Sequence, residues 1–351
     1  GRFVEQDGFT VSFHIEEQEN IKNFFAEHGF VVIKDVLSTK EIDASKSEIW
    51  DQIEAYSNKM RTEDMKNWSL WKRCCSYLWD PAPPVNRNDP TTFSTYWPFP
   101  GHGIFATAAN SKQMFNNRQS VNVFKSFETV MNTKDILVSI DRFGVINPTT
   151  EETKSWLHWD LNPWYATQTE KPLYERMQTP ERRKEILLER WANLKSAQNV
   201  LQIENNGTTT LDPPPVQGFI ALSDNALGEG GFMCIPGFHK KIGEWANENK
   251  KYSDHTFIKV PVEDENFSDS KIVKVPVREG DLLIWSSALP HCNYGGNKQR
   301  ICQYIKMIPA CIYSDKEIAK ARADAIRSLL PSDFVISPLG MKVFGLNLGD
   351  N

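Results

Sequence analysis

Residues 280–309, GDLLIWSSALPHCNYGGNKQRICQYIKMIP, carry the clearest β-strand pattern in the chain. A Gly-Asp turn precedes the apolar run 282–285, and a short loop then places His291 directly after Pro290. A glycine-rich turn leads into a second apolar run, 300–309. Turn residues on both sides of short apolar runs are typical of strands that pack into a core. We therefore expect two buried strands with a histidine between them.

The second run contains an arginine where a buried strand is expected. Strand alternation separates two sets of side chains, with Arg300, Cys302 and Tyr304 on one face and Ile301, Gln303 and Ile305 on the other. An arginine that points into an apolar core needs an anion there, because an unpaired buried charge is very costly. A ligand carboxylate fits this need, since the guanidinium can bind it through two hydrogen bonds.

The second half of the chain repeats this strand pattern. Short apolar runs alternate with turn-rich segments, at 200–204, 216–224, 232–236, 257–262, 272–277, 281–285 and 300–310. Many short strands with turns between them favour a sandwich or barrel. The GEGG segment 228–231 has no helix start after it, so we interpret it as a tight hairpin turn and not as a phosphate-binding loop.

Helix signals flank the β-rich region. Residues 15–60 show a helix, a strand and a second helix, with Gly29 as a C-cap and Ser38 with Glu41 as a capping box. Three more helices are expected, at 118–131, from Thr179-Pro180 onward, and at about 315–328 after a second capping box of Ser314 and Glu317.

No composition shift divides the chain, so we expect one domain over residues 1–351, mainly β with flanking helices. The β-core is expected at about 136–310, with 15–60 as its N-terminal support. Segment 80–117 is rich in proline and glycine yet holds several aromatic residues, and 161–200 interrupts the strand pattern. Both are candidate lids over a site.

The overall composition excludes several classes of function. The net charge is -5, with 40 basic and 45 acidic residues mixed along the chain, so we expect no nucleic-acid partner. No apolar run approaches the roughly 20 residues that span a bilayer. We expect a soluble, intracellular and cytoplasmic protein, although a start at Gly1 is also compatible with a removed targeting segment. The six cysteines form no C-x-x-C pair and are expected to be reduced and buried.

A candidate metal site begins in SWLHWDLNPW, residues 155–164. His158 and Asp160 lie two positions apart, which on a strand places both side chains on the same side. Two histidines and one carboxylate are the ligand set that holds Fe(II) while leaving other coordination positions open. His291 is the expected third ligand because it lies at a strand end. The other histidines lie in N-terminal elements, turns or polar loops and are discounted: His14, His28, His102, His239 and His255.

These segments together resemble a known family. LHWDLNP, QGFIALSDNALGEGGFMCIPGFHK, GDLLIWSSALPHCN and QRICQYIKM look like the phytanoyl-CoA dioxygenase-like branch of the Fe(II)/2-oxoglutarate-dependent oxygenases. The N-terminal FFAEHGFVVIKDVLSTKEID is similar to the opening of that branch. The resemblance covers roughly residues 20–60 and 118–310. One departure is Phe238 in PGFH, where the family commonly has serine.

The resemblance implies a double-stranded β-helix, the jelly-roll or cupin-like core, with Fe(II) on His158, Asp160 and His291. It also implies 2-oxoglutarate and O2 as co-substrates, with the far carboxylate of 2-oxoglutarate on Arg300 and further contacts from Asn293 and Phe219. Related halogenases replace the carboxylate ligand by a small residue, so Asp160 argues against halogenation. No catalytic residue beyond the metal ligands is expected.

The expected reaction is oxidation of an unactivated C–H bond of a small organic molecule, with succinate and CO2 as co-products. Hydroxylation, desaturation and oxidative cyclisation remain open, as do a polar small molecule and a fatty-acyl compound as substrate. Trp164, Arg142 and Trp97 are the candidate substrate contacts. Trp164 follows the metal motif on a short turn, and Trp97 belongs to the aromatic-rich segment 80–117.

Two other functions remain as alternatives. A non-catalytic jelly-roll that binds a ligand predicts little affinity for iron and no succinate formation. A hydrolytic zinc enzyme could use the same three ligands, but Arg300 has no evident role in it. The sequence carries no signal for an oligomeric state.

Overall fold

The fold is built on two antiparallel β-sheets. The computed structural model describes residues 3–67, 82–93, 96–97, 103–105, 111–150, 155–167, 179–194, 200, 203–204, 215–250 and 257–348. Its strands are β1 (Phe30–Ile33), β2 (Ile104–Phe105), β3 (Ile136–Ser139), β4 (Phe143–Ile146), β5 (His158–Trp159), β6 (Val216–Ala221), β7 (Gly231–Cys234), β8 (Ile258–Lys259), β9 (Val273–Val275), β10 (Leu282–Ser286), β11 (His291–Tyr294) and β12 (Arg300–Pro309).

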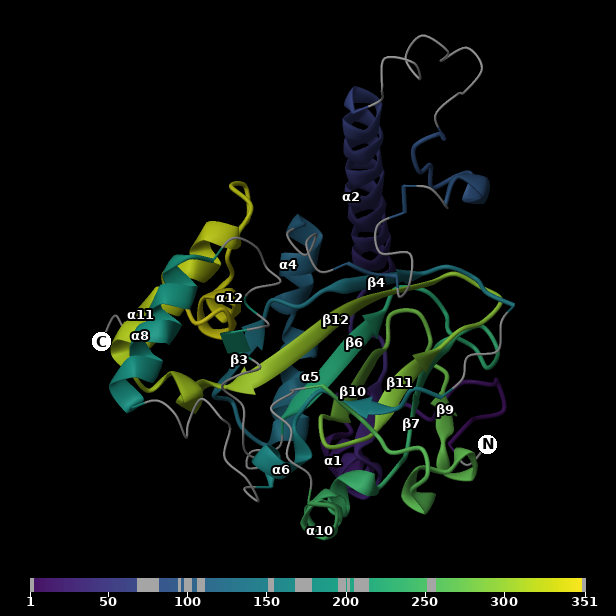
Figure 1. Ribbon diagram of the computed structural model, residues 1–351, viewed down its shortest axis with the longest axis vertical. Helices are drawn as coiled ribbons and strands as arrows, with labels where there is room; N and C mark the ends of the chain where they lie inside the picture. The colour runs from purple at the N-terminus through teal and green to yellow at the C-terminus, as the bar shows by residue number, and fades with distance from the viewer. Residues whose placement is uncertain are drawn as a thin grey trace.

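The two sheets differ in size. The large sheet has the order β1-β10-β6-β12-β4-β2, with β3 also pairing with β12, and the small sheet has the order β8-β5-β11-β7-β9. The longest strand, β12, runs through the middle of the large sheet (Figure 1). Strand β1 pairs with β10, so the N-terminal segment forms part of the sheet as well as supporting it.

Alternation along the strands of the large sheet separates two cores. On β12, Ile301 and Ile305 pack on the helix-covered side, whereas Cys302 and Tyr304 face the small sheet. This confirms the predicted faces of the run 300–309. The inner core is shared by both sheets, as Phe219 of the large sheet and other aromatic residues of the small one belong to the same cluster. The candidate site lies in this inner space.

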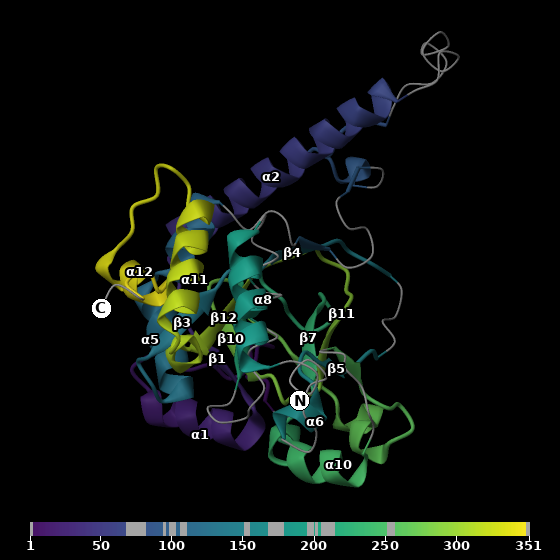
Figure 2. The same cartoon turned by 60° about the vertical axis from the view of Figure 1, so that its left-hand side comes forward.

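The helices cover the outer face of the large sheet and one end of the molecule. They are α1 (Gln18–His28), α2 (Thr39–Lys66), α4 (Lys112–Arg118), α5 (Val121–Met131), α6 (Pro163–Ala166), α8 (Pro180–Ala192), α10 (Ile242–Glu248), α11 (Lys316–Leu329) and α12 (Pro338–Val343). Figure 2 shows α8 and α11 side by side, whereas α2 projects away from the sheets. No helix in the described part of the chain is long and apolar enough to cross a membrane.

Several local predictions are confirmed. Ser38 and Glu41 form the capping box of α2. Gly29 ends α1 in the left-handed conformation, with φ of 77°, which a residue without a side chain adopts at no steric cost. Thr179 caps α8, and Pro180 is its first residue. In the described part of the chain the cysteines Cys234, Cys292, Cys302 and Cys311 are free thiols, and the first three are buried as expected. Cys311 is exposed, so the expectation of burial is wrong for it. Cys74 and Cys75 lie outside the described residues.

The fold class needs a correction. Helices hold more of the described chain than "mainly β" implies, since α2 alone has 28 residues and the longest strand has 10. Segment 200–204 was expected as a strand, but Val200, Ile203 and Glu204 are helical. Val200 and Ile203 both belong to the outer core, and their spacing of three is a helical spacing.

Three boundary predictions are also wrong. The helix expected at 118–131 begins at Val121, and α4 precedes it inside a segment expected as a loop, because Met114 and Phe115 are buried. Helix α11 is capped by Asp315 and not by Ser314. The GEGG segment connects β6 to β7, which belong to different sheets, so it is a crossing between sheets and not a hairpin.

Candidate metal and co-substrate site

Two histidines lie opposite each other on neighbouring strands of the small sheet. Strands β5 and β11 are antiparallel, and His158 on β5 is the register partner of His291 on β11. Asp160 follows β5 directly, two positions after His158 and so on the same side of an extended chain. The fold therefore brings together the three residues that the sequence pattern nominated.

The three side chains form a compact set of ligand atoms. Their donor atoms all lie within 4.8 Å of one another. Nε2 of His158 lies 3.6 Å from Oδ1 of Asp160, and Nε2 of His291 lies 3.5 Å from Oδ2. The other ring nitrogens face backbone oxygens, with Nδ1 of His158 3.3 Å from Trp156 O and Nδ1 of His291 2.9 Å from Leu289 O. A proton on each Nδ1 leaves both Nε2 lone pairs free for a metal ion.

The protonation states of His158 and Asp160 favour the binding of a cation. Burial, together with the neighbouring His291, lowers the pKa of His158 to about 4. Burial by itself would raise the pKa of Asp160, but the hydrogen bond and charge of His291, helped by His158 and Gln217, hold it below its usual value. At neutral pH His158 is therefore neutral and Asp160 is ionised, which is the state that binds a divalent metal.

Gln217 orients the carboxylate of Asp160. This residue of β6 donates from Nε2 to Oδ2 of Asp160 at 2.9 Å, and its own Oε1 accepts from the Ser287 hydroxyl at 3.0 Å. Hydrogen bonds of this kind orient a metal ligand and tune its basicity. Sequence reasoning missed both residues, because the contact of Gln217 with Asp160 depends on how β6 of the large sheet faces the small sheet, and Ser287 acts through Gln217.

Aromatic side chains surround the histidines. The ring of Trp156 stacks on His158 at 4.8 Å between centroids and 11° between planes, and Phe257 stacks on the same imidazole at 4.4 Å. Phe232 stacks on His291 at 5.6 Å. Trp156 also donates its indole N–H to Asn293 O at 2.9 Å. These contacts fix the two imidazoles and keep the site apolar around its donor atoms.

Arg300 lies in the same inner space with one nitrogen unpaired. Its side chain is 1% exposed. Nε donates to Asn225 Oδ1 at 3.1 Å and Nη1 donates to Asn293 Oδ1 at 2.7 Å, while the guanidinium carbon lies 4.4 Å from the centroid of the Phe219 ring. Nη2 is buried and has no hydrogen-bond partner among the described residues. Asn225 is a third residue that sequence reasoning missed.

The surroundings of Arg300 fit an acidic co-substrate. The two asparagine contacts are to neutral oxygens, so the hydrogen bonds orient the guanidinium without neutralising it. A buried cation with an unpaired N–H donor is costly unless an anion accepts a hydrogen bond from that donor and balances the charge. A carboxylate directed at Nη2 would supply both the missing acceptor and the missing charge, and the donor set of the triad likewise fits Fe(II).

Two of the predicted substrate contacts have packing roles in the structure. Trp164 is 3% exposed, lies 6.0 Å from the ring of Trp245 and donates its N–H to Asn249 O. It therefore packs beneath α10, because the turn that was expected to reach the barrel mouth is the short helix α6. Trp97 packs on Trp50 of α2 and on Phe93, so its contacts belong to the outer core.

Arg142, the third predicted substrate contact, is placed differently. It lies between β3 and β4, and its guanidinium carbon is 6.0 Å from the ring centroid of Tyr304. Tyr304 faces the inner core. Arg142 therefore places its charged group against a side chain of the inner space.

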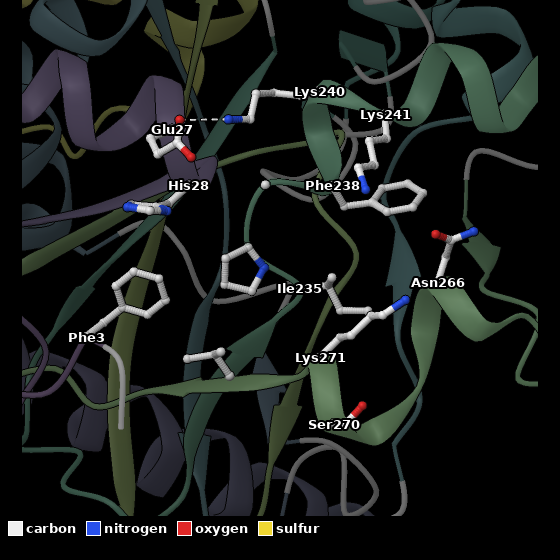
Figure 3. Close-up of a pocket in the computed structure, with 13 residues that line it drawn as sticks. Phe3, Glu27, His28, Ile235, Phe238, Lys240, Lys241, Asn266, Ser270 and Lys271 are labelled. Atoms are coloured by element: carbon white, nitrogen blue, oxygen red, sulfur yellow. Dashed lines mark hydrogen bonds and ion pairs between the residues drawn. The ribbon is translucent and has the colours of Figure 1, made fainter.

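A surface cavity of about 530 Å³ lies elsewhere in the molecule. It is formed by the end of α1, the segment after β7 and the turns η4 (Glu265–Phe267) and η5 (Asp269–Lys271). Figure 3 shows lysine side chains around it, one of which, Lys240, pairs with Glu27. None of the triad residues lines this cavity.

Comparison with known proteins shows a similarity to one protein family. A family model described as "Phytanoyl-CoA dioxygenase (PhyH)" matches residues 206–295. A "Putative phytanoyl-CoA dioxygenase" of Dictyostelium discoideum is 25% identical over 375 residues, covering 98% of this chain and 97% of the relative. The chain is therefore similar to the phytanoyl-CoA dioxygenase family.

Solved structures share the fold at low sequence identity. GlcNAc Inducible Gene 2 of Candida albicans is 15% identical with a TM-score of 0.53, over 95% of this chain and 78% of that one. The epimerase SnoN, in complex with Fe3+, alpha ketoglutarate and nogalamycin RO, is 13% identical with a TM-score of 0.43, over 84% of each chain. The first of these supports the two-sheet fold of this chain.

Similarity to the phytanoyl-CoA dioxygenase family and the triad geometry agree on the class of chemistry. The chain is an oxidoreductase of the Fe(II)- and 2-oxoglutarate-dependent class, with a His-Asp-His triad of the two-histidine, one-carboxylate type.

Proposed function

We propose that this chain binds Fe(II) through His158, Asp160 and His291, binds 2-oxoglutarate through Arg300, and oxidises a C–H bond of a small organic molecule. The observation that carries the proposal is the buried Nη2 of Arg300, which has no partner among the described residues. It is the donor that an acidic co-substrate would use. A zinc hydrolase on the same triad gives this arginine no role.

The spacing of the site supports the assignment. Asn293, which orients Arg300, lies two residues after His291 on β11. Two residues along a strand advance about 7 Å, a step that a five-carbon dicarboxylate can bridge. One carboxylate would lie at Nη2 of Arg300 while the keto-acid end lies at the triad. Phe219 would pack beside it, below the guanidinium.

The overall reaction balances with O2 as the oxidant. One oxygen atom converts 2-oxoglutarate to succinate and CO2. The other enters the substrate as a hydroxyl group, or leaves as water when two hydrogens are removed in desaturation or ring closure. Bound Fe(II) would supply the O2 and redox chemistry that the side chains themselves lack.

The protein residues perform binding, orientation and exclusion of water. Backbone oxygens hold Nδ1 of both histidines, Gln217 holds Asp160, and two asparagines hold Arg300. Phe219 is fully buried and Phe232 is 2% exposed, so this part of the inner core is dry. A dry and preorganised site confines reactive chemistry to the bound substrate.

Succinate release tests the proposed function. The full chain, loaded with Fe(II) and supplied with 2-oxoglutarate, O2 and a panel of small metabolites, should release succinate. Asp160→Ala should lose this release while keeping its fold by circular dichroism. Equal succinate release by the wild type and Asp160→Ala would contradict the role of Asp160 as a metal ligand. No release by wild-type protein of confirmed iron content with any compound would favour the non-catalytic alternative.

A further inference from the structure

A second arginine, Arg142, lies beside the inner space, and part of its guanidinium makes no hydrogen bond to a described residue. Arg142 accepts a backbone hydrogen bond from Tyr304 N at 2.9 Å, and its side chain lies over the Tyr304 ring. The side chain is 35% exposed, whereas Tyr304 is 9% exposed. Arg142 therefore lies at the rim, with its charged end between the inner core and solvent.

One edge of this guanidinium is held in place. Nε donates to Oδ1 of Asp141 at 3.1 Å, and the backbone N–H of Arg142 donates to the same oxygen at 2.7 Å. Asp141 is 6% exposed. Neither Nη1 nor Nη2 makes a hydrogen bond to any described residue. The pair of terminal N–H groups is thus oriented in advance and available to an oxyanion, which a guanidinium binds bidentately.

Arg142 lies on the Tyr304 side of the inner space, and among the described residues its hydrogen bonds and its ring contact do not involve Arg300. On β12, Tyr304 lies four residues after Arg300, which corresponds to about 13 Å along a strand. Arg142 lies over the Tyr304 ring, and the Tyr304 hydroxyl accepts from Asn293 Nδ2 at 3.4 Å, so Tyr304 contacts both Arg142 and the asparagine that orients Arg300. Burial by itself would lower the pKa of Arg142, but the carboxylates of Asp141 and Asp160 raise it. The charge of Arg142 is therefore within reach of the metal ligand Asp160.

A buried lysine adds positive charge at the same end. Lys306 lies two residues after Tyr304 and is the register partner of Gln217, the residue that holds Asp160. It is 4% exposed, and its ammonium group also interacts electrostatically with Asp141 and Asp160. Arg142 and Lys306 are therefore two positively charged side chains that both interact electrostatically with Asp141 and Asp160.

We propose that the substrate of this enzyme is an organic carboxylate and that the terminal N–H groups of Arg142 bind its carboxylate group. The inference rests on the proposed function, since it places the substrate beside the same triad. Lys306 strengthens the positive potential that attracts the anion. A free acid fits this site, whereas the thioester of the same acid lacks the carboxylate that Arg142 would bind.

The test uses matched compounds on the full chain loaded with Fe(II) and 2-oxoglutarate. The probes are free carboxylic and amino acids, the primary amides of the same acids, and their coenzyme A thioesters. Anaerobic binding is read as a change in the visible absorption of the protein with Fe(II) and 2-oxoglutarate, and turnover is read as succinate release. The variants are Arg142→Gln, Arg142→Lys and, as a control, the exposed Arg182→Gln.

The expected result is that acids bind at least 10-fold more tightly than their amides. Arg142→Gln should remove this preference and raise KM for the acid 10- to 100-fold with a smaller change in kcat. Arg142→Lys should restore part of it, and Arg182→Gln should behave as wild type. The affinity for 2-oxoglutarate should stay within about 2-fold in every variant.

Several outcomes would overturn the inference without touching the proposed function. They are equal binding of acids and amides, preferential binding of thioesters or phosphorylated analogues, no response to any acid, or weakening of 2-oxoglutarate binding by Arg142→Gln. Absence of the 2-oxoglutarate-dependent absorption in iron-loaded wild type would instead contradict the proposed function itself.

Discussion

His158 and His291 are register partners across β5 and β11, with ring centroids 4.6 Å apart. This pairing joins two segments that are remote in sequence, and Asp160 completes the set from the end of β5. Because both imidazoles are fixed through Nδ1 to backbone oxygens, the metal site is built before a metal arrives. A preformed donor set costs little reorganisation on binding.

Removal of the Arg300 charge should weaken 2-oxoglutarate binding strongly. Loss of one partner of a buried ion pair costs about 3–5 kcal/mol, so Arg300→Met should raise the Kd for 2-oxoglutarate by at least about 100-fold. Fe(II) affinity in the absence of 2-oxoglutarate should be unchanged. Anaerobic calorimetry measures both values. Arg182→Ala, which removes an exposed arginine, is the matched control, and equal Kd values in the Arg300 variant and this control would refute the assignment.

Gln217 should act as a positioning residue for Asp160. Gln217→Ala removes the 2.9 Å hydrogen bond to Oδ2 and should lower metal affinity about 10- to 100-fold, as changes behind a metal ligand commonly do. Gln113→Ala, which removes a glutamine of α4 that bonds Asn117, should leave metal affinity unchanged. Metal titration followed by tryptophan fluorescence tells the two apart. Wild-type metal affinity in both variants would contradict the positioning role of Gln217.

Asp281 should make the stability of the fold depend on pH. Its side chain is 2% exposed, Oδ1 accepts from Asp35 N at 3.0 Å, and Oδ2 has no partner among the described residues. Burial raises the pKa of Asp281 to about 7 from an ordinary value near 3.8. The folded state therefore binds a proton more tightly than the unfolded state. This contribution is fully favourable below about pH 4 and is lost as pH rises toward about 7.

Asp281→Asn should consequently stabilise the protein at pH 8. The gain is at most about 4 kcal/mol, since about three pKa units at roughly 1.4 kcal/mol each set the limit. The gain should shrink steadily between pH 7 and pH 5. Urea unfolding of both proteins at these pH values provides the comparison. A difference in unfolding free energy that does not vary with pH would show that Asp281 is ionised at no cost.

Local signals in the sequence were sufficient for much of the fold. The capping box of Ser38 and Glu41, the C-cap at Gly29 and the alternation from Arg300 to Ile305 depend on neighbours within a few residues. Such signals report conformations that the chain adopts without distant partners. The errors occurred where distant partners decide. Helical Glu204 pairs at 2.9 Å with buried Arg322 of α11, a contact that no local pattern encodes.

The candidate site was predicted in its charged residues, whereas several of its neutral residues were missed. His158, Asp160, His291 and Arg300 stand out because charged or metal-binding residues are rare in apolar strands. Gln217 and Asn225 do not stand out, since amides are common in turns and on strand edges. Their roles follow from how the two sheets face each other, and so does the packing of Trp164 under α10. Strand register and sheet packing are properties of the whole fold.

The central claim is that His158, Asp160 and His291 bind an iron that 2-oxoglutarate then joins. The most direct measurement is the visible charge-transfer absorption that develops when 2-oxoglutarate is titrated anaerobically into the full chain with Fe(II). We expect a saturable band for the wild type, no band for His158→Ala or Asp160→Ala, and a band that needs much higher 2-oxoglutarate for Arg300→Met. The absence of any band in wild-type protein of confirmed iron content, or an undiminished band in the triad variants, would contradict the account.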